Sequence, residues 1–369
     1  MEKPVHFNGL NGIRAIASLL VVIWHTDQFS RLFNIKEIGF HKNGMAGNAV
    51  DMFFVLSGFL ITYLLLIEKA KTNTINLKNF YLRRIFRIWP LYYFALIMSL
   101  VLIYLKIIPN VQNISTSLFF YIFLMANIAY VLKITIPGIT PLWSIGVEEQ
   151  YYLLWPHIVK RSSNYLKSFF YFFVVYSFIK LLSYLIFTPD STIYEFLITT
   201  RIDIMCMGAI GAYIAYSKKN ILLKIIYRKE IQILSWFILI ISIIYKPIHI
   251  YSFIDPEINS IFYLFIILNI SSNKKSLISL ENIFFNFIGK ISYGIYVYHM
   301  ILIYLISYLF SYLNLQLRYI EIHIIVLIST IFVAWISYKF FETPFLKLKN
   351  KYSIIKSSTV IKEVVKQTK

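Results

Sequence analysis

Cysteine and acidic side chains are both scarce in this sequence of 369 residues. The single cysteine, Cys206, excludes a disulfide framework within the chain and a metal site built from several cysteines. Charged residues make up 14% of the chain, compared with about 25% in a typical soluble domain. Asp and Glu together number 17, against 36 Lys and Arg. A soluble domain with an ordinary charged surface is therefore excluded.

Hydrophobic residues are abundant instead, at 59% of the chain, with a mean hydropathy of +0.68. A soluble core of this size cannot hide so many apolar side chains, so the surplus must face lipid. A helix needs about 20 apolar residues to cross a hydrocarbon core of roughly 30 Å. The sequence predicts an all-α fold, a polytopic integral membrane helix bundle. Its eleven apolar segments are residues 10–29, 49–67, 88–108, 117–132, 142–159, 169–187, 196–216, 231–245, 258–270, 283–305 and 320–341.

Basic residues gather in short loops between the apolar segments, which is typical of the cytoplasmic side of a membrane. The net charge of +19 has this origin, and no nucleic-acid partner is expected. Basic loops at 69–87 and 160–167 enclose three apolar segments, although only an even number can cross. Residues 117–132 form the shortest of the three, so we expect a re-entrant piece there, about ten full spans, and a cytoplasmic N-terminus.

The first apolar segment contains two ionisable residues, Arg14 and His25, and is expected to be a retained span rather than a cleaved signal peptide. They are eleven residues apart, which on a helix is three turns plus roughly 20° and a rise of about 16 Å. Both therefore lie on one helix face. An ionisable group inside a span is a functional candidate by default. The alternative for His25 is a packed histidine that donates to a neighbouring carbonyl.

Asp51 opens the second segment and is expected at a depth similar to that of His25. A carboxylate there would orient the imidazole or raise its basicity. The alternative is a helix N-cap. Ser57 and Gly58, on the same segment, are interpreted as packing residues, since small residues let membrane helices approach closely.

Three arginines, Arg83, Arg84 and Arg87, precede the third segment, with aromatic residues between them. Arg83 and Arg87 share a helix face at a spacing of four residues. Guanidinium groups bind phosphate through paired hydrogen bonds. The alternative is a plain anchor on the cytoplasmic side of the membrane.

Further ionisable residues lie in or at the edge of later apolar segments. Glu148 and Glu149 lie at the edge of one segment, and Glu148 is one turn from Ser144. Arg201 lies inside another and is expected to need a buried anionic partner, with Asp203 or Glu148 as the candidates. His299 and Glu342 come later in the chain.

Taken together, these segments resemble the membrane acyltransferase-3 family, the O-acetylases of lipopolysaccharide, peptidoglycan and other surface glycans. The resemblance covers nearly the whole chain. Two departures are Asn11, where an Asp is frequent, and Gly146, where a Ser is frequent. The shared landmarks, in order, are Asn11 to Ala17 leading to His25, Val50 to Phe59, Arg83 to Pro90, Leu142 to Tyr151, and Ser292 to His299.

The resemblance implies transfer of an acyl group, commonly acetyl, from cytoplasmic acyl-coenzyme A to a hydroxyl of a cell-surface glycan or lipid-linked saccharide. It implies that Arg83, Arg84 and Arg87 receive the coenzyme phosphates, and no metal is expected. Acyl transfer to a hydroxyl needs a base and a donor for the developing oxyanion. His25 is the candidate base or transient acyl carrier, with Glu148 or Asp51 positioning it. Arg14 is expected to hold the donor or to form an ion pair nearby.

The expected domain organisation is an acyltransferase-3 domain at residues 1–345 and a basic cytoplasmic tail at 346–369. The expected location is the bacterial cytoplasmic membrane, with the lipid bilayer, the acyl donor and the glycan acceptor as partners. Two other classes remain open. The first is a transporter or flippase of a lipid-linked glycan, because many spans with buried charges also describe carriers. The second is a scaffold without catalytic activity in a wall-synthesis assembly.

Overall fold

The structure is a computed structural model, and it describes residues 7–39, 44–188, 190–218, 220–245, 250–353 and 355. Across these ranges the chain forms helices and no strand, which confirms the predicted all-α class. Two 3-10 turns, η1 (Ser30–Phe33) and η3 (Thr140–Leu142), and a π-turn, η4 (Tyr338–Glu342), interrupt them. The helices are α1 (Leu10–Gln28), α2 (Met45–Thr72), α3 (Leu77–Tyr104), α4 (Ile114–Ile122), α5 (Ala126–Val131), α6 (Trp143–Arg161), α7 (Tyr165–Ile186), α8 (Thr192–Thr200), α9 (Ile202–Tyr216), α10 (Asn220–Ile226), α11 (Lys229–Ile244), α12 (Asp255–Ser272), α13 (Ile283–Tyr312), α14 (Tyr319–Ser337) and α15 (Thr343–Lys351).

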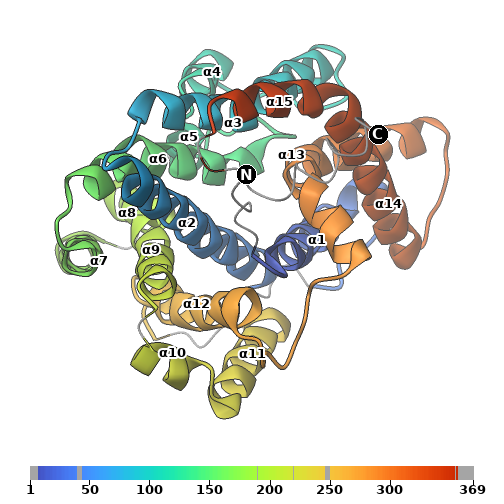
Figure 1. Cartoon of the computed structure of the whole chain (residues 1–369). Coiled ribbons are helices and arrows are strands. Elements are labelled where there is room, and N and C mark those ends of the chain that lie inside the picture. Colours follow the sequence, from blue (N-terminus) through green and yellow to red (C-terminus); the bar gives the residue numbers. More distant parts are fainter. Residues whose placement is uncertain are drawn as a thin grey trace, which may run out of the picture.

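The helices form one bundle, with α1, α2 and α13 toward its middle and α7, α10, α11 and α14 at its outside (Figure 1). The most extensive packing joins α2 with α9 and α1 with α13. The outer helices present large apolar side chains outward; Tyr171 and Leu185 on α7, for example, are 69% and 68% exposed. Such a surface needs an apolar surrounding, because soluble proteins rarely expose large continuous apolar patches.

Six helical stretches among the described residues are long and apolar enough to cross a membrane. They are Met45–Thr72, Leu77–Tyr104, Tyr165–Ile186, Thr192–Tyr216, Ile283–Tyr312 and Tyr319–Lys351. The predicted polytopic membrane bundle is supported by these six stretches. The predicted count of about ten spans is not confirmed by their length and composition.

The segment 117–132, predicted to be re-entrant, lies within two short helices, α4 and α5. With 9 and 6 residues, they measure about 13 Å and about 9 Å at 1.5 Å per residue, so neither alone crosses a core of roughly 30 Å. The segment packs on α6 through a pair of amides: Asn127 donates to Gln150 at 3.2 Å, and Gln150 donates back at 2.9 Å. A Cβ at Gly146 would lie 3.0 Å from Asn127 Oδ1, so a glycine at this position allows α5 to approach α6.

Two glycines bring α2 and α9 into backbone contact. A Cβ at Gly58 would lie 2.0 Å from the carbonyl oxygen of Met205, and a Cβ at Gly208 would lie 2.0 Å from that of Val55. Any side chain at either position would force the two helices apart. The interpretation of Gly58 as a packing residue is therefore confirmed. Small residues at a helix contact let membrane helices approach closely.

At one end of the bundle, a basic side chain joins the end of α2 to the end of α6. Lys69, in the last turn of α2, donates to the carbonyls of Val159, Lys160 and Ser162 at the end of α6, at 2.9 to 3.0 Å. Helix α15 packs against α3 at the same end. The beginning of the predicted basic tail is thus helical as far as Lys351. The rest of that tail, at residues 354 and 356–369, lies outside the described residues.

Candidate active site

Helix α1 carries both Arg14 and His25, as predicted. His25 Nδ1 lies 2.9 Å from the carbonyl oxygen of Val21, one turn earlier. A carbonyl only accepts, so Nδ1 is the protonated nitrogen and Nε2 of the neutral ring keeps a lone pair. The contact is the packed-histidine arrangement that the sequence left open. It also leaves a base at Nε2, so it is compatible with a catalytic role.

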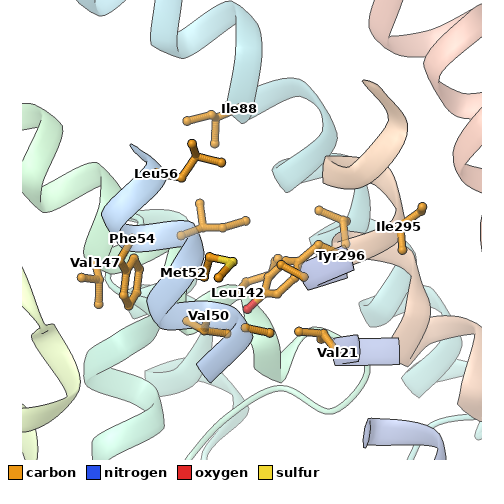
Figure 2. Close-up of a cluster of buried hydrophobic side chains, with 14 of the residues drawn as sticks. Val21, Val50, Met52, Phe54, Leu56, Ile88, Leu142, Val147, Ile295 and Tyr296 are labelled. Atoms are coloured by element: carbon orange, nitrogen blue, oxygen red, sulfur yellow. The ribbon is translucent and has the colours of Figure 1, made fainter. Parts of the chain in front are cut away.

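A cavity lies between α1, α2, α3, α6 and α13. Its empty space, including the space open at its mouth, is about 870 Å³. Apolar side chains, among them Val50, Phe54 and Ile88, form much of its wall (Figure 2). Its charged lining is Arg14, Arg84, Arg87 and Glu148, and its hydroxyl lining is Ser57, Ser144, Tyr152, Ser292, Tyr293 and Tyr296.

Two of the three clustered arginines line this cavity, and the third does not. The Arg84 guanidinium lies 5.6 Å from the centre of the Tyr152 ring, and that of Arg87 lies 5.9 Å from the Tyr293 ring. Arg83 instead pairs with Glu68 at 2.8 Å and donates to the carbonyl of Tyr352 at 2.9 Å. The structure therefore brings Arg84 and Arg87, three residues apart, to the cavity. Arg83 lies outside the cavity lining, beside the buried carboxylate that α2 supplies.

The carboxylate in the cavity belongs to Glu148. Its two oxygens accept hydrogen bonds from Ser57 at 2.7 Å and from Tyr152 at 2.9 Å. Ser57 is thus a polar contact of the cavity in addition to any packing role. Glu149, the next residue, accepts from Trp89 at 3.1 Å and is not part of the cavity lining. The partners of Glu148 are Ser57 and Tyr152, and Nδ1 of His25 contacts Val21, so none of these hydrogen bonds is the predicted contact between Glu148 and His25.

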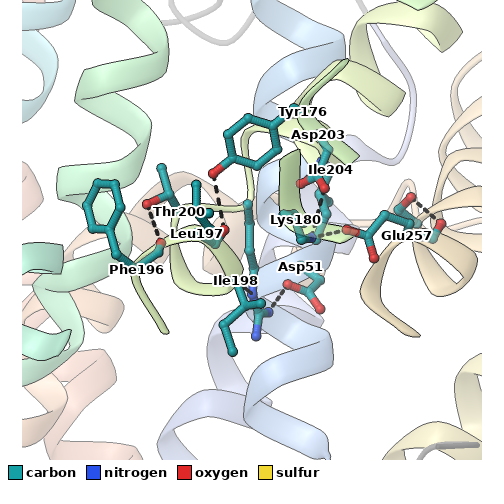
Figure 3. Close-up of polar contacts among 12 residues, drawn as sticks. Asp51, Tyr176, Lys180, Phe196, Leu197, Ile198, Thr200, Asp203, Ile204 and Glu257 are labelled. Carbon is teal, nitrogen blue, oxygen red and sulfur yellow. Dashed lines mark hydrogen bonds and ion pairs between the residues drawn. The ribbon is translucent and has the colours of Figure 1, made fainter. Parts of the chain in front are cut away.

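Asp51 is likewise held by a different partner from the one predicted. Its carboxylate forms an ion pair with Arg201, 150 positions later in the chain (Figure 3). It lies inside α2, which begins at Met45, so it is not an N-cap either. Arg201 does have a buried anionic partner, as predicted, but neither of the two expected carboxylates fills that role. The Arg201 guanidinium also lies 6.0 Å from the centre of the Trp143 ring, at the start of α6.

A second buried charge cluster is adjacent and was not found from the sequence. Lys180 of α7 pairs with Asp203 of α9 at 2.8 Å and with Glu257 of α12 (Figure 3). All three residues are at most 5% exposed. The signal available in the sequence was Lys180 itself, an isolated lysine within the apolar segment 169–187. The cluster joins α7, α9 and α12 and is not part of the cavity lining, so its role is to hold these helices together.

His299 of α13 lies beside His25. The centres of the two rings are 4.9 Å apart, and the ring planes are inclined at 56°. His299 is fully buried, and its Nδ1 lies 2.7 Å from the carbonyl oxygen of Tyr296. The Tyr296 hydroxyl lines the cavity and contacts Ser144 Oγ at 2.7 Å. Tyr296 thus connects the two histidines with the cavity that holds the arginines.

Among the described residues, no group of His, Cys, Asp and Glu side chains is arranged to hold a metal ion. The charged groups of the cavity are instead three guanidiniums and one carboxylate. Guanidiniums at this spacing are suited to a polyanionic ligand. The one carboxylate leaves them with an excess of positive charge.

The chain is similar in sequence to known proteins. Two relatives are the O-acetyltransferase OatA of Staphylococcus aureus strain NCTC 8325 / PS 47 and that of strain MRSA252. Each is 28% identical over 370 residues, which cover 94% of this chain and 58% of the relative. The chain thus spans little more than half the length of these relatives. No solved structure matches it significantly. The acyltransferase domain matches residues 7–339, nearly the whole chain, and the chain therefore belongs to the acyltransferase-3 family.

Proposed function

We propose that this protein transfers an acyl group, most simply acetyl, from acyl-coenzyme A to a hydroxyl of a cell-surface glycan. The observation that carries the proposal is the cavity in which Arg14, Arg84 and Arg87 converge within a chain of the acyltransferase-3 family. The names of the relatives, O-acetyltransferases, support acetyl as the group and oxygen as the acceptor atom.

The arginines are suited to the donor. Coenzyme A carries several phosphate charges at one end and the thioester at the end of a long flexible arm. Guanidinium groups bind phosphates through paired, charge-assisted hydrogen bonds. Arg84 Nε is buried without a hydrogen-bond partner among the described residues, so it is free to donate to a ligand. The cavity extends from these arginines to Tyr296, in the direction that the arm would take toward the histidines.

The chemistry would take place at His25. Acyl transfer requires the acceptor hydroxyl to lose its proton as its oxygen attacks the acyl carbon. His25 Nε2 has the lone pair for that task, because Nδ1 is committed to Val21. The same lone pair would serve if His25 carried the acyl group transiently. Glu148 lines the cavity together with the arginines and would keep their side chains oriented toward the donor. This role replaces the predicted contact of Glu148 with His25.

The proposed orientation follows from the basic loops. The N-terminus, the loop with Arg83 and the end of α6 would lie on the cytoplasmic side of the bacterial cytoplasmic membrane, where acyl-coenzyme A is made. His25, about 16 Å further along α1 than Arg14, would lie toward the other side. The acyl group would therefore travel through the cavity while the coenzyme remains on the cytoplasmic side.

Thioester cleavage by the purified protein tests the proposal. Release of free thiol from acetyl-coenzyme A would be followed with and without a glycan acceptor, and acetyl ester formed on the glycan would be measured in parallel. We expect glycan-dependent thiol release that is absent in His25→Ala, with this variant inserted and expressed like the wild type. A transporter or a scaffold would release no thiol, and a full rate in His25→Ala would remove His25 from the chemistry.

A further inference from the structure

The contacts of His25 with the described residues include no carboxylate. Asp51 is paired with Arg201, and Glu148 is held on the cavity wall. Yet a histidine that takes a proton becomes a cation, and a cation within a membrane bundle needs a polar partner to stabilise it. The contacts of His25 with the described residues are the Val21 carbonyl, the Trp24 ring and the His299 ring. Among these three, only His299 offers a free lone pair.

The lone pair of His299 is on Nε2. Because Nδ1 faces the carbonyl oxygen of Tyr296, it is the protonated nitrogen, and Nε2 of the neutral ring is an acceptor. That atom is buried and has no hydrogen-bond partner among the described residues. Buried polar atoms nearly always have a partner, so an unpaired one calls for an explanation.

An unpaired histidine nitrogen alone would not distinguish this site. His323 on α14 has the same local arrangement, with Nδ1 3.0 Å from the Tyr319 carbonyl and Nε2 buried without a partner among the described residues. Its ring packs on Tyr319, at 4.3 Å between centres. The feature found at His299 and not at His323 is a second histidine in ring contact. What distinguishes His299 is therefore its contact with His25, and not the unpaired atom alone.

We propose that His299 is a positioning residue for acyl transfer: its neutral ring, which keeps the Nε2 lone pair, lies against the His25 ring and stabilises the imidazolium that forms there. The inference rests on the proposed function. The O–H bond of the acceptor breaks and an N–H bond forms on His25, while the hydroxyl oxygen bonds to the acyl carbon. The carbon–sulfur bond of the donor then breaks, and the proton passes to the thiolate to give free coenzyme A. His299 stabilises the imidazolium between these two events.

Three substitutions at His299 separate this role from packing. In His299→Gln the amide oxygen reaches about as far as Nε2 and keeps an acceptor beside the His25 ring. In His299→Asn the shorter amide reaches only the place of Nδ1, and His299→Leu removes both polar atoms. The matched control is His323→Leu, which removes a histidine with the same backbone contact away from His25.

The measurements are kcat and KM for acetyl-coenzyme A with a saturating glycan acceptor. Loss of a polar interaction with a charged group corresponds to a decrease of roughly 10- to 100-fold in rate. We expect that decrease in kcat for the Asn and Leu variants, with KM for the donor unchanged, and a smaller loss for the Gln variant. His323→Leu should keep the wild-type kcat. Donor binding by each purified variant checks that the cavity is intact.

Two results would overturn the assignment. One is a wild-type kcat in His299→Leu or His299→Asn. The other is an equal loss in the Gln, Asn and Leu variants, which would indicate packing. The failure of the proposed function looks different, because the wild-type protein itself would then release no thiol with any hydroxyl acceptor.

Discussion

Glu148 accepts a hydrogen bond from Tyr152, one turn later on α6, with 2.9 Å between the two oxygens. The contact holds a half-buried carboxylate on the wall of the arginine-lined cavity. Its neighbour Glu149 is also half-buried but contacts Trp89. Two adjacent acids on one helix therefore have separate environments, and they can be tested against each other.

Glu148→Gln should lower kcat/KM for acetyl-coenzyme A by roughly 100-fold, since about 3 kcal/mol of charge-assisted hydrogen bonding is lost and the arginines lose their counter-charge. Glu149→Gln is the matched control and should lower it far less. Steady-state kinetics on both purified variants makes the comparison. Equal losses in the two variants would show that the cavity carboxylate has no special part.

The three clustered arginines should respond differently to lysine, which keeps the charge but not the forked geometry. Arg84→Lys and Arg87→Lys should each raise KM for acetyl-coenzyme A by roughly 10- to 100-fold, the equivalent of one charge-assisted hydrogen bond. Arg83→Lys should leave this KM unchanged, because Arg83 faces Glu68 and not the cavity. An unchanged KM in the Arg84 and Arg87 variants would show that both residues serve only to fix the membrane topology.

Lys180→Met should destabilise the bundle by about 3–5 kcal/mol, because it leaves two carboxylates buried without their cation. Asp203 and Glu257 are those carboxylates. The triple variant with Asp203→Asn and Glu257→Gln should recover most of this loss. Thermal unfolding in one detergent, followed by circular dichroism, compares the three proteins. A Lys180→Met variant as stable as the wild type would mean that the cluster contributes nothing.

The short helices α4 and α5 give a topology test. If residues 117–132 do not cross the membrane, the flanking Lys106 and Lys133 positions lie on the same, external side. Single cysteines at these positions, in a Cys206→Ala background, should then be labelled from outside by an impermeant reagent. Cysteines at Lys71 and Lys160 should be protected until the membrane is opened. Labelling of the 106 and 133 positions from opposite sides would show a full crossing.

Features local to one helix were predictable from the sequence. The period of the α-helix places Arg14 and His25 on one face of α1, and the shortness of segment 117–132 indicated that it is not a simple span. The partners of buried charges were not predictable. Asp51 and Arg201 are 150 positions apart, and their pairing depends on how α2 and α9 pack, which no periodicity records. That Arg84 and Arg87 line the cavity while Arg83 does not has the same cause.

The contacts of Gly58 with Met205 and of Gly208 with Val55 limit how the cavity can open. Backbone touches backbone there, so separating α2 from α9 would break close packing along both helices. We therefore expect the cavity wall formed by α2 to move only together with α9. Any widening that admits a bulky ligand then falls to the opposite wall, where α3 and α13 meet the cavity through side chains such as Arg87 and Tyr293.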